Sequence, residues 1–89
     1  MFFVYILHSD KDGLLYTGYT ADIKNRLKAH RGGFVRSTQK RLPVRLIYCE
    51  TFLCEQDAKR REKYLKGGNG KKELQVMLRT YFENHPWKK

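Results

Sequence analysis

Two runs of strand-forming residues near the start of the chain, joined by a turn sequence, constrain the fold more than any other feature. Phe2–Leu7 is continuously apolar and aromatic, and Leu14–Thr20 is again rich in residues that favour strands. Between them, Ser9–Gly13 has the sequence SDKDG, and an Asp-Gly pair is typical of a tight turn. The pattern predicts a β-hairpin against which the rest of the chain must pack.

A helix is expected after the hairpin. Thr20 or Asp22 can cap its first turn, because their side-chain oxygens accept hydrogen bonds from free backbone N–H groups. Ile23 and Leu27 recur at helical spacing, and Gly32-Gly33 is a typical helix end. A basic connector over residues 34–43 then leads to the second half of the chain.

A third strand is predicted over Val44–Phe52, and its apolar residues on both faces indicate a strand well inside the fold. Helices are predicted over Glu55–Lys66 and Lys72–Phe82, with a break at Gly67–Gly70 between them. The order ββαβαα predicts an α+β domain: a small three-stranded antiparallel or mixed β-sheet flanked by three helices. We expect one domain over residues 1–83 and a flexible tail over residues 84–89.

Charge is the most informative bulk property. The 89 residues include 19 lysines and arginines against nine aspartates and glutamates, a net charge of +10. A compact domain with this excess repels itself unless a polyanion neutralises the charge. Nucleic acid and an acidic membrane surface are the candidate partners, and a basic protein that binds neither is the remaining alternative.

Several protein classes are disfavoured by what the sequence lacks. Cys49 and Cys54 match no redox or zinc spacing, so we expect core or surface thiols. Met1–Leu7 has no basic start and no cleavage site, so it does not resemble a signal peptide. No apolar run approaches the roughly 18 residues of a membrane span. A cytoplasmic protein is expected.

Three polar residues fall on or beside apolar helix stripes. Arg26 and His30 are four residues apart and so share a face of the first helix. Glu62 lies between Ala58 and Leu65 on the stripe of the second helix, so it is expected to point toward the sheet. A buried carboxylate must be paired or bound to a metal. A structural ion pair between Glu62 and Arg26 and a functional site are both consistent with this pattern.

Two strand tyrosines extend the cluster. If His8 pairs with Gly13, the hairpin loop is Ser9–Asp12 and Tyr5 lies directly opposite Tyr16. The two phenols would then sit side by side on the face that carries Arg26 and Glu62. A slip of one residue would place them on opposite faces. Alone, the tyrosines are also explained as good strand formers.

The tyrosines, Arg26 and Glu62 occur in an order that resembles a known family. Phe3-Val4-Tyr5 and Tyr16-Thr17-Gly18 resemble the paired GIY and YIG motifs of the GIY-YIG nucleases, although only the tyrosine of the first motif is kept and Thr17 replaces an isoleucine. The segment DIKNRLKAH is similar to the family's helix with its catalytic arginine, here Arg26. Glu62, in RREKYLK, matches the family's metal-binding glutamate. The resemblance covers nearly the whole chain and is strongest to the short stand-alone bacterial members.

The resemblance implies phosphodiester hydrolysis with one divalent ion, Mg²⁺ or Mn²⁺, held by Glu62 and weakly bound without substrate. Arg26 would stabilise charge on the phosphate. Tyr5 is expected to be the base and Tyr16 to position water or phosphate, with His30 a further candidate catalytic residue. An unperturbed tyrosine has a pKa of about 10, and a nearby arginine and metal ion are expected to lower it.

Two family features are less clear in this chain. Some relatives carry a second histidine or tyrosine after the first helix, where this chain has Ser37 and Thr38, so that role is expected to be absent. Many relatives place an asparagine after the metal glutamate, and Asn69 is the nearest candidate, although it sits between glycines as a turn former would.

Substrate contacts are expected from basic side chains that bind phosphate without reading sequence. The candidates are Lys24, Lys28, Arg31, Arg36, Lys40, Arg41, Lys63, Lys66 and Asn69. We expect a monomeric DNA endonuclease of repair or recombination, with DNA favoured over RNA, a protein partner that supplies targeting, and no membrane contact. The alternatives are a non-catalytic nucleic-acid-binding module and a protein-interaction domain that keep the fold.

Overall fold

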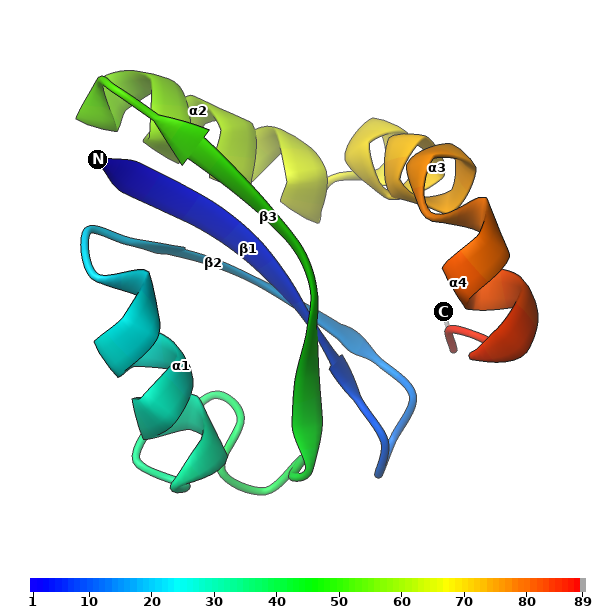
Figure 1. Cartoon of the computed structure of the whole chain (residues 1–89). Helices are drawn as coiled ribbons and strands as arrows, with labels where there is room; N and C mark the ends of the chain where they lie inside the picture. Colours follow the sequence, from blue (N-terminus) through cyan, green and yellow to red (C-terminus); the bar gives the residue numbers. More distant parts are fainter. Residues whose placement is uncertain (89) are drawn as a thin grey trace.

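The computed structural model describes residues 1–88 and shows a three-stranded sheet with helices on both faces (Figure 1). The strand order is β2-β1-β3 and both pairings are antiparallel, so the α+β architecture is confirmed. There are four helices within the described residues, in place of the three expected. The elements in chain order are β1 (Phe2–Ser9), β2 (Leu15–Thr20), α1 (Ile23–Arg31), β3 (Val44–Phe52), α2 (Glu55–Lys66), α3 (Gly68–Met77) and α4 (Arg79–Asn84).

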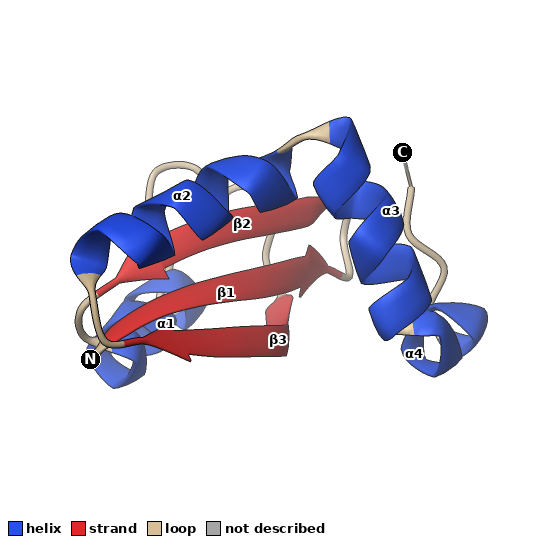
Figure 2. Ribbon diagram, turned by 90° about the horizontal axis from the view of Figure 1, so that it is seen from above, coloured by secondary structure: helices blue, strands red, loops and turns tan. Residues whose placement is uncertain are grey.

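The two faces of the sheet are covered by different helices. In Figure 1 the sheet lies between α2, above, and α1, below, and Figure 2 shows α2 in front of the strands with α1 behind them. Helices α3 and α4 continue past the far end of the sheet. Because side chains alternate along a strand, even-numbered residues of β1 face α2 and odd-numbered ones face α1.

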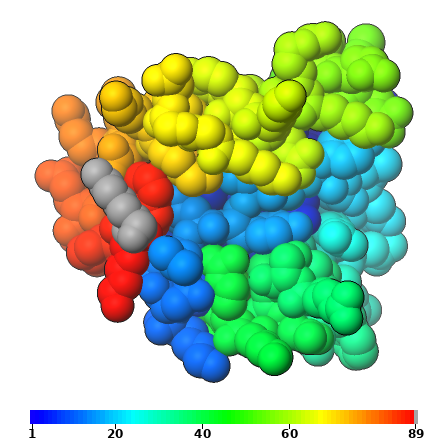
Figure 3. Space-filling view, turned by 180° about the vertical axis from the view of Figure 1, so that it is seen from behind, coloured from blue at the N-terminus to red at the C-terminus, as the bar shows by residue number. Residues whose placement is uncertain are grey.

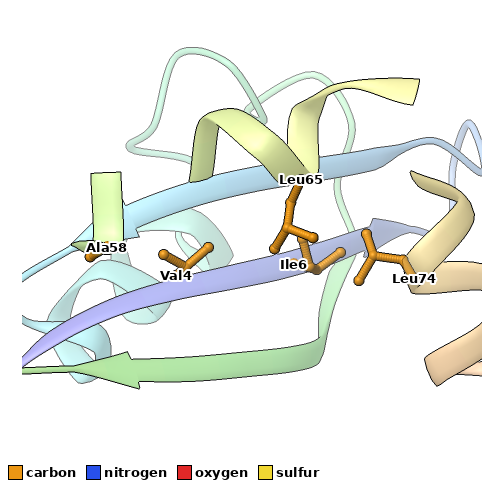
Figure 4. Packing of buried hydrophobic residues seen from close by; sticks show 5 residues of the cluster. All are labelled: Val4, Ile6, Ala58, Leu65 and Leu74. Carbon is orange, nitrogen blue, oxygen red and sulfur yellow. The ribbon is translucent and has the colours of Figure 1, made fainter. Parts of the chain in front are cut away.

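The apolar core lies on the α2 side. Val4 and Ile6 of β1 are fully buried against Ala58 and Leu65 of α2 and Leu74 of α3 (Figure 4). Burying side chains of this size stabilises the fold by about 1.5–3 kcal/mol each. The core therefore fixes α2 over the sheet, and this contact sets where its polar residues lie.

The hairpin register differs from the predicted one by two residues. Tyr5 pairs with Gly18, and Tyr16 pairs with Leu7, so the two tyrosines are not directly opposite. The loop has the predicted length but starts one residue later, because Ser9 still pairs with Leu14 (N···O 3.0 Å) and Gly13 is needed in the loop with φ +73°. A shift of two residues preserves the face, so the tyrosines still lie on the same side.

Strand β3 has the predicted bounds but is an edge strand, not an interior one; β1 is central. A bulge in β3, opposite Ile6 and Leu7 of β1, explains why β3 has apolar residues on both faces. Before the bulge Tyr48 pairs with Ile6 on the α2 side, and beyond it Leu46 pairs with Leu7 on the α1 side. One extra residue moves the rest of the strand to the other face.

Most helix ends match the sequence signals. The Asp22 carboxylate accepts from the Asn25 N–H and caps α1, and α2 has the predicted bounds. The predicted break between the two helices is confirmed at Gly67 but is shorter than the expected Gly67–Gly70, because only Gly67 is extended and α3 starts at Gly68. Gly70 serves helix packing, since a Cβ there would lie 2.2 Å from the Tyr64 carbonyl oxygen.

The C-terminal segment contacts the hairpin end of the sheet. His8 Nδ1 accepts from the Tyr81 hydroxyl at 2.5 Å, and the Lys88 N–H donates to the Gly13 carbonyl at 2.9 Å. The boundary expected at residue 83 stays a prediction, and Lys89 of the expected tail lies outside the described residues. Across residues 1–88, no helix has the length and apolar character needed to cross a membrane.

Candidate functional site

The Tyr5 ring crosses the edge strand β2 at Gly18. Tyr5 is fully buried, and a Cβ built on Gly18 would lie 2.3 Å from its Cζ and 2.4 Å from its hydroxyl oxygen. No residue other than glycine leaves room for the ring at this position. The missing side chain of Gly18 thus allows the phenol to reach toward the free edge of the sheet.

A buried chain of three polar side chains begins at that phenol. The Tyr5 hydroxyl lies 2.8 Å from His30 Nε2, and His30 Nδ1 lies 2.7 Å from Thr38 Oγ1. All three residues are fully buried. Burial, reinforced by the Arg26 charge, lowers the pKa of His30 to about 4, so the imidazole is neutral at pH 7 and serves as donor on one nitrogen and acceptor on the other. The chain links β1, α1 and the connector.

Tyr16 and Arg26 form the outer part of the cluster. The Tyr16 ring lies 6.3 Å from the Tyr5 ring and 5.2 Å from the His30 ring, and unlike Tyr5 it is partly exposed. Hydrogen bonding with Tyr5, and to a lesser degree with Tyr16, raises the pKa of Arg26. Arg26 is exposed, so a guanidinium beside two phenols faces solvent at the β2 edge.

The expected lowering of the Tyr5 pKa is not found. Burial raises the pKa of Tyr5 to about 12, although hydrogen bonding with Arg26 lowers it in the direction expected. Desolvation penalises the phenolate more than one neighbouring cation stabilises it. A buried phenol that holds its proton this firmly is suited to donating and positioning hydrogen bonds.

Glu62 reaches the same edge from the other side of the sheet. It does not roof the face of Tyr5 as expected, because α1 and α2 cover opposite faces (Figure 1). Its side chain is 23% exposed and pairs with Lys66, four residues on, at 3.2 Å. The ion pair with Arg26 that the sequence left open is not found within residues 1–88. Burial raises the pKa of Tyr5 most, and the neighbouring Tyr16 and the charge of Glu62 raise it further. Glu62 and Tyr5 therefore interact electrostatically.

The exposed edge of β2 is therefore where both sides of the site meet. Figure 3 shows this strand as a blue band between α2 and α3 above, in yellow-green to yellow, and the connector below, in green. Tyr16 and Arg26 approach from the α1 side and Glu62 from the α2 side. The arrangement presents a phenol, a guanidinium and a carboxylate to a ligand lying along the strand edge.

A divalent ion fits this site only in part. Residues 1–88 contain no cluster of three or more His, Cys, Asp or Glu side chains able to hold a metal. Glu62 supplies one hard oxygen ligand, and hard cations such as Mg²⁺ accept substrate phosphate oxygens and water as the others. The residues present fit an ion that Glu62 would hold and whose other ligands would come from substrate and water.

Two of the predicted phosphate-binding residues, Arg41 and Lys66, form ion pairs within the protein, and the rest are exposed. Arg41 is engaged with the hairpin, because it pairs with Asp12 at 2.9 Å and donates to the Leu15 carbonyl. Lys66 is paired with Glu62, and Asn69 lies exposed in the first turn of α3. The others are exposed and form no ion pair within the described residues: Lys24, Lys28, Arg31, Arg36, Lys40 and Lys63.

Two residues of the site were not found from the sequence. At Thr38 only the absence of the family's second histidine or tyrosine was expected, yet Thr38 is fully buried and hydrogen-bonded to His30 Nδ1. Its signal is indirect: a buried histidine needs a partner for each ring nitrogen, and the connector that follows the helix offers a hydroxyl. Gly18 has a clearer signal, since a glycine inside a strand often marks close approach of another group.

A hollow of about 500 Å³ lies at the opposite edge of the sheet. Phe52, Asp57, Arg60, Arg61 and Tyr64 line it, where α2 meets β3. Arg61 is bonded there to the carboxylates of Glu50 and Glu73. Its cation is neutralised, so this hollow shares neither the residues nor the charge of the β2 edge.

The fold and the cluster together define a class of protein. Residues 1–75 match the family model described as the GIY-YIG catalytic domain. This chain belongs to the GIY-YIG family, whose members are nucleases that act on nucleic acid and generally use divalent metal ions. The resemblance stated from the tyrosine motifs, Arg26 and Glu62 is confirmed at the level of the family.

Within that family the chain is similar to short bacterial proteins. It is 43% identical over 84 residues to a UPF0213 protein of Streptococcus agalactiae, covering 93% of this chain and 89% of the relative. It is 41% identical over 78 residues to a UPF0213 protein of Clostridium perfringens, covering 86% and 83%. The solution NMR structure of the UPF0213 protein BH0048 from Bacillus halodurans is 36% identical, with a TM-score of 0.55 over 86% of this chain and 85% of that one.

Proposed function

We propose that this chain is a metal-dependent endonuclease that hydrolyses phosphodiester bonds in DNA, directed by the structure or damage of the DNA in repair or recombination. The observation that carries the proposal is the meeting of Tyr16, Arg26 and Glu62 at one exposed strand edge. A protein that only binds nucleic acid has no need for a half-buried carboxylate at the same strand edge as a phenol and a guanidinium. The +10 net charge supports a polyanionic substrate.

The exposure of each residue decides its proposed role: exposed side chains contact substrate and buried ones position them. Arg26 binds the scissile phosphate through its fork of donors, which matches phosphate oxygens. Tyr16 is the phenol that contacts the attacking water, because it is partly exposed, whereas Tyr5 is fully buried with a raised pKa. We therefore assign Tyr16 in place of Tyr5 as the base or water-orienting group. Tyr5, held by His30, positions Arg26.

Glu62 is the protein ligand of the divalent ion, Mg²⁺ or Mn²⁺. When bound, the ion supplies a Lewis acid that stabilises negative charge on the phosphate and on the leaving oxygen. Lys66 stays close to Glu62 and balances its charge in the absence of substrate. Weak metal binding without DNA follows, because one carboxylate provides only one of the ligands that the ion requires.

The test compares wild type with Glu62→Gln on single-stranded, branched, damaged and fully paired DNA, with Mg²⁺ or Mn²⁺ and with chelator. We expect cleavage that needs the metal and falls by at least about a hundredfold in Glu62→Gln, since even changing the partners of metal ligands costs about 10- to 100-fold. Binding in chelator should stay within about twofold of wild type.

Glu55→Gln is the matched control, because Glu55 also lies on α2 and also pairs with a lysine four residues on, Lys59. It should cut at close to the wild-type rate. Salt-sensitive DNA binding without cleavage of any substrate would support a non-catalytic binding module. An absence of DNA binding would support the protein-interaction alternative.

A further inference from the structure

Phe34 is an exposed aromatic side chain on the connector, immediately after α1. It is 84% exposed, whereas its neighbour Val35 is buried. Its backbone is fixed, because its N–H donates to the Ala29 carbonyl at 2.9 Å and Gly33 turns the chain with φ +79°. The ring lies against Gly32, where a Cβ would come within 2.7 Å of Phe34 Cε2. The ring is thus presented to solvent from a fixed support.

The surroundings of Phe34 are strongly basic. Residues 23–49 contain eight lysines and arginines and no aspartate or glutamate. Arg41 and Arg45 pair with Asp12 and Asp10 of the hairpin. The other six form no ion pair within residues 1–88: Lys24, Arg26, Lys28, Arg31, Arg36 and Lys40. An apolar ring in this setting fits a ligand that combines negative charge with a flat hydrophobic group.

Other exposed apolar side chains lack this combination. Leu53 is 80% exposed and Val76 is 76% exposed, but both are aliphatic. Leu53 lies between Glu50 and Glu55 in the sequence, and Val76 follows Glu73 on α3. An aromatic ring can stack on a nucleobase, and aromatic side chains in basic grooves are a common way to hold unpaired nucleotides.

Phe34 is also tied to the catalytic cluster. It lies four residues after His30 and four before Thr38. A hydrogen bond between His30 and Thr38 joins the end of α1 to the connector on either side of Phe34. Phe34 lies eight residues after Arg26, about 12 Å along the axis of α1 at the helical rise of 1.5 Å per residue. A base resting on Phe34 would then belong to a nucleotide a few positions from the phosphate that Arg26 is proposed to bind.

We propose that Phe34 stacks on an unpaired nucleobase of the bound strand, so that the site prefers DNA with single-stranded or splayed nucleotides within a few positions of the scissile phosphate. The proposal rests on the proposed nuclease function for the identity of the ligand. It adds a substrate class, DNA with unpaired bases, and a residue that selects it.

The test measures binding with chelator present, so it does not depend on cleavage. Wild type and Phe34→Leu are titrated with a 12-nucleotide thymidine strand, an abasic strand of equal length and a fully paired duplex. We expect Phe34→Leu to lose about tenfold in affinity for the thymidine strand, in line with typical stacking losses. Its affinities for the abasic strand and the duplex should stay within about twofold. Leu53→Ala should bind all three as wild type does.

A second variant reports the contact directly. Phe34→Trp in a Trp87→Phe background places an indole at the proposed position and removes the native one. Its fluorescence should be quenched by the thymidine strand and not by the abasic strand. Equal losses on all three ligands, or no loss on any, would overturn the proposal. So would an indole that responds to vesicles of anionic phospholipid and not to DNA, a result that would assign this surface to membranes.

The two proposals fail separately. If wild type cuts DNA and Phe34→Leu binds every ligand normally, only the stacking role is lost. If no substrate is cut but the thymidine strand still quenches the indole, the stacking role stands and the nuclease assignment is lost.

Discussion

At the scale of single residues, the shape of the site depends on an absent side chain. Gly18 lies in the middle of β2, where glycine weakens a strand. Its position directly opposite Tyr5 lets the phenol cross the strand and reach His30 and Arg26. The glycine of the second motif is therefore explained by packing against the tyrosine of the first.

This contact makes Gly18→Ala a sharp test. The added Cβ would lie within 2.8 Å of three atoms of the Tyr5 ring, which is fully buried and has no free space to enter. We expect the free energy of unfolding in urea to fall by about 1–3 kcal/mol, the usual cost of overpacking. The control is Gly68→Ala, at a helical position with no atom within 4 Å of the added Cβ. It should raise the free energy of unfolding by about 0.5–1 kcal/mol. Equal stability of Gly18→Ala and wild type would contradict the packing described here.

The sequence identified the residue types of the site better than their geometry. Helix periodicity is enough to single out Arg26, His30 and Glu62, because polar residues beside an apolar stripe are unusual. Tyr5 and Tyr16 were placed on one face correctly because the error in the predicted register was two residues, which preserves the face. Gly18 and Thr38 could not be assigned, because each acts by touching a side chain from a distant part of the chain. Such contacts depend on register and loop path, which local patterns do not determine.

At the scale of elements, α1 is joined to the sheet and the connector through one neutral imidazole. His30 contacts Tyr5 of β1 on one ring nitrogen and Thr38 on the other. Both partners are hydroxyl groups, which can accept as well as donate, so the hydrogen bonds alone do not require a neutral ring. Burial of the ring and the Arg26 charge are what disfavour its protonation. Stability and pH are therefore linked at this point of the fold.

The sign of this linkage follows from the lowered pKa of His30. Below about pH 6.5 the unfolded chain binds a proton on this residue, while the folded chain does not until about pH 4. The free energy of unfolding should thus fall as the pH is lowered from 7 to 4, by up to about 3 kcal/mol. Burial also lowers the pKa of His8, which contributes in the same direction.

Urea unfolding at several pH values, compared between wild type and His30→Gln, separates the two histidines. The slope of stability against pH should become shallower in His30→Gln, and the slope that remains then includes the contribution of His8. An unchanged slope in His30→Gln would show that His30 is not buried in neutral form.

Element bounds were predicted well where the sequence has strong local signals, and poorly where packing decides. Val44–Phe52 and Glu55–Lys66 have the predicted bounds, and a proline precedes the strand while a glycine ends the helix. The glycines after α2 suggested a break, yet Gly70 lies inside α3 and allows two helices to approach closely. The position of β3 at an edge, with a bulge that switches its faces, is likewise a consequence of pairing with β1.

At the scale of the whole molecule, the basic surface and the carboxylate of the site come from opposite faces of the sheet and meet at its β2 edge. The acid-free stretch over residues 23–49 holds most of the basic excess and runs from the site through the connector. The carboxylate of the site comes from α2, on the other face of the sheet. Nucleic acid guided by the basic surface would meet the site along the exposed edge of β2, between the two faces.

We propose that this edge hydrolyses phosphodiester bonds with Tyr16 as the reacting phenol and Tyr5 as its buried support. Single-turnover cleavage rates of Tyr16→Phe and Tyr5→Phe, measured with saturating DNA and metal, test it most directly. We predict a loss of about 10²- to 10⁴-fold for Tyr16→Phe, the range typical of general acid–base groups, and a clearly smaller loss for Tyr5→Phe. A larger loss in Tyr5→Phe, or wild-type rates in Tyr16→Phe, would contradict the account.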